Sequence, residues 1–133
     1  MKYLSDYMES RQTELWNKTG TFFAFSNQQF EEQEQKGKEY VFLGSGMYTL
    51  KINASEVIEE GYKIYKESIE LDIKENGKDN VILRELLNHE AFYVGDIEET
   101  KNTLEDYKCI QEKDIIRVYH ENYSKYSDGF PIN

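Results

Sequence analysis

Residues 40–50 constrain the fold of this chain more than any other stretch. Tyr40-Val41-Phe42-Leu43 and Met47-Tyr48-Thr49-Leu50 are rich in aromatic and β-branched residues, and they flank Gly44-Ser45-Gly46. Two such runs with a glycine-rich connection predict a β-hairpin, which explains these glycines better than a phosphate-binding loop does. A hairpin alone is marginally stable in water, so a further strand and a covering helix are needed.

Local signals elsewhere complete the predicted fold. Residues 21–25 are short, aromatic and bounded by turn residues, so they predict a third strand. Helical spacing of apolar residues, with capping residues such as Ser26 and Asp96 and terminal glycines such as Gly20, predicts five to six α-helices. Their approximate bounds are residues 5–18, 27–36, 54–76, 79–89, 96–107 and 112–122. The predicted class is α+β, with a small antiparallel three-stranded sheet at about residues 21–50 packed with these helices.

The helix expected at residues 54–76 carries two adjoining apolar stripes. One consists of Ile58, Tyr62, Tyr65, Ile69 and Ile73, and beside it lie Val57, Ile64 and Leu71. This apolar surface is too broad for an exposed helix, so we expect the helix to cover one face of the sheet.

Length and cysteine content bound the organisation and the compartment. A chain of 133 residues predicts a single domain, here residues 1–122, with a frayed C-terminal tail at residues 123–133. The single cysteine, Cys109, excludes an internal disulfide framework and favours a reducing compartment. The N-terminus is polar and no apolar run approaches the roughly 20 residues needed to cross a bilayer, so we expect a cytoplasmic protein.

Negative charge is concentrated in the second part of the chain. Residues 54–133 contain ten basic and nineteen acidic residues, which gives −9 of the net −10. Such a field repels phosphate backbones and attracts a basic surface, so direct binding to nucleic acid is not expected. The alternative is that the charge only keeps a small protein soluble.

The segment Asn88–Asp96 combines polar and aromatic residues and allows two interpretations. His89, Glu90 and Asp96 would be the centre of an acid–base or metal site, although adjacent helical residues point about 100° apart and no catalytic or zinc motif is present. Alternatively the segment is a structural corner. Asn88 and His89 would then end one helix, Phe92 and Tyr93 would fill the core, and Asp96 with Glu99 would cap the next helix. We expect no cofactor and no metal ion.

Tyrosine is unusually frequent, at eleven of 133 residues. Several tyrosines fall late in the chain among dense acidic residues, and tyrosine is enriched in interface hot spots. Candidate partner-binding residues are Glu98, Glu99, Glu105, Asp106, Tyr107, Tyr119 and Tyr123. The alternative is that these tyrosines are half-buried, with hydrated hydroxyl groups.

Three segments resemble a family of small uncharacterised proteins of phages and mobile elements of Gram-positive bacteria. They are Thr21-Phe22-Phe23-Ala24-Phe25-Ser26 with Gln29-Phe30, then Gly44-Ser45-Gly46-Met47-Tyr48, then Arg84-Glu85-Leu86-Leu87-Asn88-His89-Glu90-Ala91-Phe92-Tyr93-Val94-Gly95-Asp96. The resemblance covers about residues 10–120 and implies a mobile-element context, with no catalytic residues to carry over. Within that context, acidic proteins of this size are often inhibitors of host defence, including anti-CRISPR proteins.

Together these patterns favour a non-catalytic acidic protein that inhibits a bacterial defence nuclease by occupying its basic nucleic-acid-binding surface. The expected partner is a nucleic-acid-handling protein such as a CRISPR effector, and neither nucleic acid nor a membrane is expected as a direct partner. The alternative hypothesis is a small metal-dependent enzyme or hydrolase centred on His89, Glu90 and Asp96.

Overall fold

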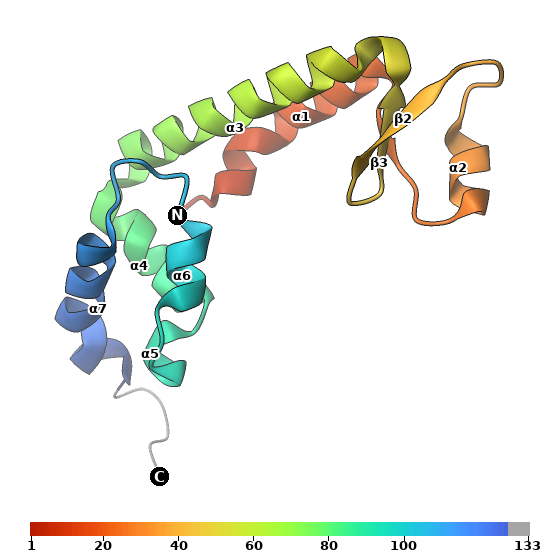
Figure 1. Cartoon of the computed structure of the whole chain (residues 1–133). Coiled ribbons are helices and arrows are strands. Elements are labelled where there is room, and N and C mark those ends of the chain that lie inside the picture. The colour runs from red at the N-terminus through yellow and green to blue at the C-terminus, as the bar shows by residue number, and fades with distance from the viewer. Residues whose placement is uncertain (128–133) are drawn as a thin grey trace. The chain divides into compact units, whose positions relative to one another are not determined.

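The computed structural model describes residues 1–127, which contain seven α-helices and one three-stranded antiparallel sheet (Figure 1). The predicted α+β class is confirmed. Whereas the length predicted one domain, the chain divides into two compact units. The N-terminal unit is Lys2–Glu70, and the C-terminal unit begins at Leu71, within the longest helix.

The elements follow the predicted order with two differences at the C-terminal end. The helices are α1 (Leu4–Thr19), α2 (Asn27–Gln33), α3 (Ala54–Asn76), α4 (Lys78–Asn88), α5 (Ala91–Val94), α6 (Glu98–Thr103) and α7 (Glu112–Ser127), and the strands are β1 (Phe22–Phe23), β2 (Tyr40–Gly44) and β3 (Met47–Leu50). The single-turn helix α5 was not predicted. The prediction of a frayed tail from residue 123 is wrong for residues 123–127, because these residues continue α7. Residues 128–133 of the predicted tail lie outside the described residues.

The predicted hairpin consists of β2 and β3, and β3 is the central strand of the sheet, whose order is β1-β3-β2. Ser45 and Gly46 both have positive φ angles, 49° and 78°, which a two-residue type I′ turn requires. Gly46 is also required sterically, because a Cβ atom there would lie 2.3 Å from the ring of Phe25.

Helices from the N-terminal unit contact both faces of this sheet. On one face, the Trp16 ring of α1 meets Phe23 edge to face at 5.1 Å. On the other face, Phe30 of α2 contacts Tyr40 and Tyr48. These ring contacts come from α1 and α2, and not from the long helix that was expected to cover the sheet.

Within the N-terminal unit, α3 lies antiparallel along α1 (Figure 1). Lys18 pairs with Glu56 at 2.7 Å and Arg11 with Glu67 at 2.8 Å, at opposite ends of the contact. The buried side of α3 includes Val57, Ile64 and Ser68. The first apolar stripe was expected to be buried. This expectation is wrong at the N-terminal end of the stripe, because Ile58 and Tyr62 are exposed.

The core of the C-terminal unit forms around α4, which contacts α5, α6 and α7. Val81, Ile82 and Leu86 on α4 are fully buried, whereas Leu87 is 40% exposed. Phe92 stacks on Tyr119 and Tyr126 of α7 at 5.1 and 5.3 Å. Among residues 1–127, none of the helices is both long and apolar enough to cross a membrane.

Candidate functional site: a buried charge network beside an acidic surface

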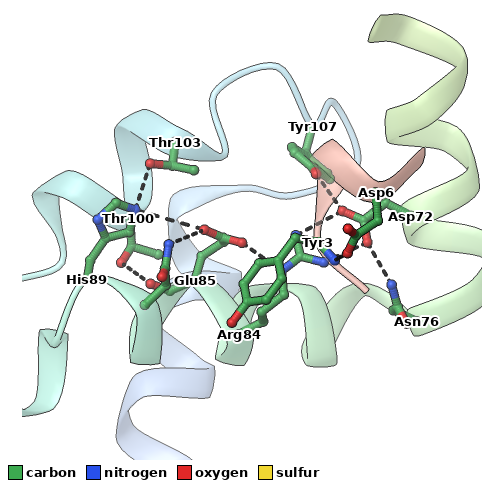
Figure 2. Close-up of polar contacts among 11 residues, drawn as sticks. Tyr3, Asp6, Asp72, Asn76, Arg84, Glu85, His89, Thr100, Thr103 and Tyr107 are labelled. Carbon is green, nitrogen blue, oxygen red and sulfur yellow. Dashed lines mark hydrogen bonds and ion pairs between the residues drawn. The ribbon is translucent and has the colours of Figure 1, made fainter. Parts of the chain in front are cut away.

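The core face of α4 contains two charged residues, Arg84 and Glu85, which are 7% and 6% exposed. The last turns of α3 supply Asp72, which is fully buried. Arg84 donates two parallel hydrogen bonds to Asp72, of 2.7 and 2.9 Å, and its Nε donates to Glu85 at 2.6 Å (Figure 2). This bidentate geometry is the strongest form of an arginine–carboxylate pair.

Further donors converge on Asp72. The Tyr107 hydroxyl donates to one carboxylate oxygen at 2.5 Å, and the Asn76 amide donates to the other at 2.8 Å. Burial alone would raise the pKa of Asp72, but hydrogen bonds from Arg84, Tyr107 and Asn76 outweigh it and hold this pKa below its ordinary value. Burial, reinforced by the hydrogen bond to Asp72, raises the pKa of Tyr107. Both effects favour the ionised carboxylate and the neutral phenol.

The network continues from Glu85 towards the surface at α6. Thr100 donates to the backbone carbonyl of Glu85 at 3.3 Å, and His89 Nε2 lies 3.9 Å from the Glu85 carboxylate. The Thr103 hydroxyl lies 2.8 Å from His89 Nε2, and the Glu99 carboxylate lies 3.4 Å from His89 Nδ1. His89 therefore connects the buried Glu85 to Thr103 and Glu99 of α6. Figure 2 shows its contacts with Glu85 and Thr103.

The candidate partner-binding residues differ in their exposure to solvent. Glu98, Glu99, Glu105 and Asp106 are all exposed, and Tyr123 is 48% exposed. Tyr119 is half-buried against Phe92. Tyr107 is only 2% exposed, so its assignment to a binding surface is wrong: its hydroxyl is bound to Asp72, 35 positions earlier.

The segment from Asn88 to Asp96 is largely the predicted corner. Helix α4 ends at Asn88, His89 follows as its C-cap, and Phe92 is buried at 5% exposure. Tyr93 is 61% exposed, so its expected place in the core is wrong. Tyr93 follows Phe92 directly in the short helix α5, and adjacent helical residues lie on different faces. The capping box predicted from Asp96 and Glu99 is wrong, because Ile97 is the N-cap of α6 and the Glu99 carboxylate lies beside His89. Asp96 instead accepts a hydrogen bond from the Glu98 N–H at 2.9 Å.

The structure does not assemble the constellation of His89, Glu90 and Asp96. His89 lies close to Thr103, Glu99 and Glu85, whereas Asp96 binds the backbone of α6. Glu90 is exposed, with a φ angle of 55°. Within residues 1–127, no group of three or more His, Cys, Asp or Glu side chains is arranged to hold a metal ion.

The sequence patterns did not predict that the side chains of Asp72, Arg84 and Tyr107 meet in the core. The available signal was a charged residue within an apolar run, since Asp72 lies between Leu71 and Ile73 and Arg84 follows Ile82-Leu83. A charged side chain is rarely buried in a core unless it is paired with an opposite charge.

Comparison with known proteins gives the family and nothing finer. Neither the curated proteins nor the solved structures include a match to this chain. A model described as a family of unknown function (DUF7659) matches residues 4–125, which is most of the sequence. The chain therefore belongs to the DUF7659 family, whose function is unknown.

Proposed function

We propose that this chain is a non-catalytic acidic binding protein that occupies a basic, nucleic-acid-binding surface of another protein. One observation carries the proposal. Residues 90–106, here called the acidic segment, contain six acidic residues and one basic residue, and all six acidic side chains are exposed. The acidic segment thus holds five of the ten net negative charges in 17 residues. A field of this density steers association with a basic surface.

Aromatic side chains give the same unit apolar anchors. Tyr93 on α5 is 61% exposed and Tyr123 on α7 is 48% exposed, and α5 and α7 are in contact. Tyrosine combines a large contact area with a low entropic cost of ordering, so exposed tyrosines beside a charged surface suit a protein interface.

The buried network supports a binding role over a catalytic one. Asp72 and Arg84 are hydrogen-bonded to each other in the interior. Their remaining hydrogen bonds join them to Tyr107, Asn76 and Glu85. These charged groups therefore stabilise the fold. The rigid core that they stabilise would hold α6 and its carboxylates in a fixed arrangement, which lowers the entropic cost of binding.

The resemblance to mobile-element proteins leads us to a specific partner class. We infer a bacterial defence nuclease, such as a CRISPR effector, whose nucleic-acid channel the chain would occupy in the cytoplasm of the host cell. Phage and mobile-element origin, anti-CRISPR activity and cytoplasmic location are parts of this proposal. The chain would act as a mimic of the phosphate backbone.

The test is to add the purified chain to a panel of defence nucleases and measure DNA cleavage and binding. We expect inhibition of at least one effector, competition with its nucleic acid, and affinity that falls steeply from low to high salt. Binding that does not change with salt would contradict the electrostatic mechanism. A panel without any inhibited nuclease would reject the proposed partner class.

One contact favours a second candidate function, a small hydrolase. Thr103 Oγ1, the His89 imidazole and the Glu99 carboxylate follow one another at 2.8 and 3.4 Å, in the order of nucleophile, base and orienting group. This arrangement would replace the expected partners Glu90 and Asp96. Hydrolysis of p-nitrophenyl acetate by the wild type and by Thr103→Val and His89→Ala variants decides the matter: equal rates in all three exclude the hydrolase.

A further inference from the structure

Helix α3 presents two apolar sides within the N-terminal unit, and one of them is exposed at Ile58 and Tyr62. Val57 and Ile64 are 5% and 3% exposed on the side that faces α1. Ile58 and Tyr62, on a neighbouring side, are 59% and 67% exposed. Large apolar side chains that are exposed next to one another are typical of an interaction surface.

The exposed side has the spacing of a coiled-coil seam. Ile58, Tyr62, Tyr65 and Ile69 follow one another at intervals of four, three and four residues, which corresponds to heptad positions d, a, d and a. Tyr65 is half-buried and Ile69 is 9% exposed, so the accessible part of the seam is centred on Ile58 and Tyr62.

Charges beside this seam indicate what covers it. Glu59 and Lys66 both occupy position e, and both are exposed. Within residues 1–127 neither side chain takes part in an ion pair. They are seven residues apart, about 10 Å along the helix, which is too far for them to pair with each other.

Position e of one helix faces position e of its neighbour only when the two helices are antiparallel. Two antiparallel copies of α3 would therefore bring Glu59 of each copy to Lys66 of the other, and the seam is complementary to itself. In a parallel pair, position e faces position g, where α3 has the uncharged residues Gly61 and Ser68.

We propose that α3 binds a second copy of this chain in antiparallel orientation, through Ile58 and Tyr62 and two symmetric Glu59–Lys66 ion pairs.

Sedimentation equilibrium of the full chain tests the apolar part of the proposal, at about 0.15 M salt so that the repulsion between acidic copies is screened. We expect a monomer–dimer equilibrium, and at least about a tenfold weaker dimer for the Ile58→Gln/Tyr62→Gln variant with its melting temperature unchanged. Ile52, which is 88% exposed and outside the seam, supplies the control: Ile52→Gln should leave the dimer intact. A wild-type chain that stays monomeric up to about 0.5 mM overturns the proposal.

Charge reversal tests the antiparallel orientation. Glu59→Lys and Lys66→Glu should each weaken self-association, because each creates two pairs of like charges. The double variant Glu59→Lys/Lys66→Glu should restore the dimer, and an equimolar mixture of the two single variants should form a heterodimer. A double variant as weak as the single variants, or a mixture that stays monomeric, contradicts the proposed register.

Discussion

At the scale of single residues, the C-terminal unit contains two arginine–aspartate pairs of similar geometry in opposite environments. Arg84 and Asp72 have side chains that are 5% and 0% exposed, whereas those of Arg117 and Asp79 are 42% and 56% exposed. Both arginines are bidentate. Since desolvation decides what an ion pair is worth, the two pairs should respond very differently to the same substitution.

We predict that Arg84→Met lowers the free energy of unfolding by about 3–5 kcal/mol, because it leaves Asp72 and Glu85 without their buried cation. Arg117→Met is the matched control and should lower the free energy of unfolding far less, because its ion pair with Asp79 is exposed to solvent. Urea denaturation measures both. Combining Arg84→Met with Asp72→Asn should cost less than the sum of the two single changes, and strict additivity would mean that the pair is not coupled.

The acid side of the stability profile should depend on Asp72. Its pKa is lower in the folded chain than its ordinary value, so the ionised carboxylate stabilises the fold above about pH 3.9, and this stabilisation is lost as the pH falls through the folded pKa. The wild type should therefore be more stable than Asp72→Asn at neutral pH, and the difference should shrink below about pH 4. A difference that stays constant from neutral to acidic pH would contradict this role.

At the scale of the elements, local sequence signals predicted where helices begin and end. They did not predict which side of a helix is buried. Gly20 adopts the expected left-handed C-cap, and Ser26 caps α2 by accepting a hydrogen bond from Gln29. Such contacts join residues a few positions apart, so their spacing is visible in the sequence. The periodicity of α3 revealed two apolar stripes but not which one packs inside the chain, because that choice depends on α1. The partners of Asp72 were invisible for the same reason.

The two neighbours in α5 provide a prediction for the corner between α4 and α6. Phe92 is 5% exposed and stacks on α7, so Phe92→Ala should cost about 3–5 kcal/mol through the cavity that it leaves. Tyr93→Ala, one position along and 61% exposed, should cost less than about 1 kcal/mol. Thermal unfolding of the two variants compares them directly. Equal losses would mean that the corner is not anchored by the Phe92 ring.

At the scale of the whole molecule, local sequence patterns predicted the α+β class and the charge count predicted the acidic character, but neither predicted the division into two units. The boundary falls at Leu71 inside α3, where no glycine, proline or change in composition marks it. Acidic residues occur in both units, yet the exposed carboxylates of the acidic segment are the densest group. Function should therefore depend on where negative charge lies, and not only on how much the chain carries.

Two variants with the same net charge test this claim most directly. One replaces Glu98, Glu99 and Glu105 by Gln and Asp106 by Asn, and the other replaces the exposed residues Glu9, Glu14, Glu31 and Glu32 of the N-terminal unit by Gln. With a nuclease that the wild type inhibits, the association rate constant is measured for each variant. We expect the first variant to associate at least about tenfold more slowly and to lose inhibition, while the second behaves as the wild type does. Equal effects of the two variants would contradict a binding surface at the acidic segment.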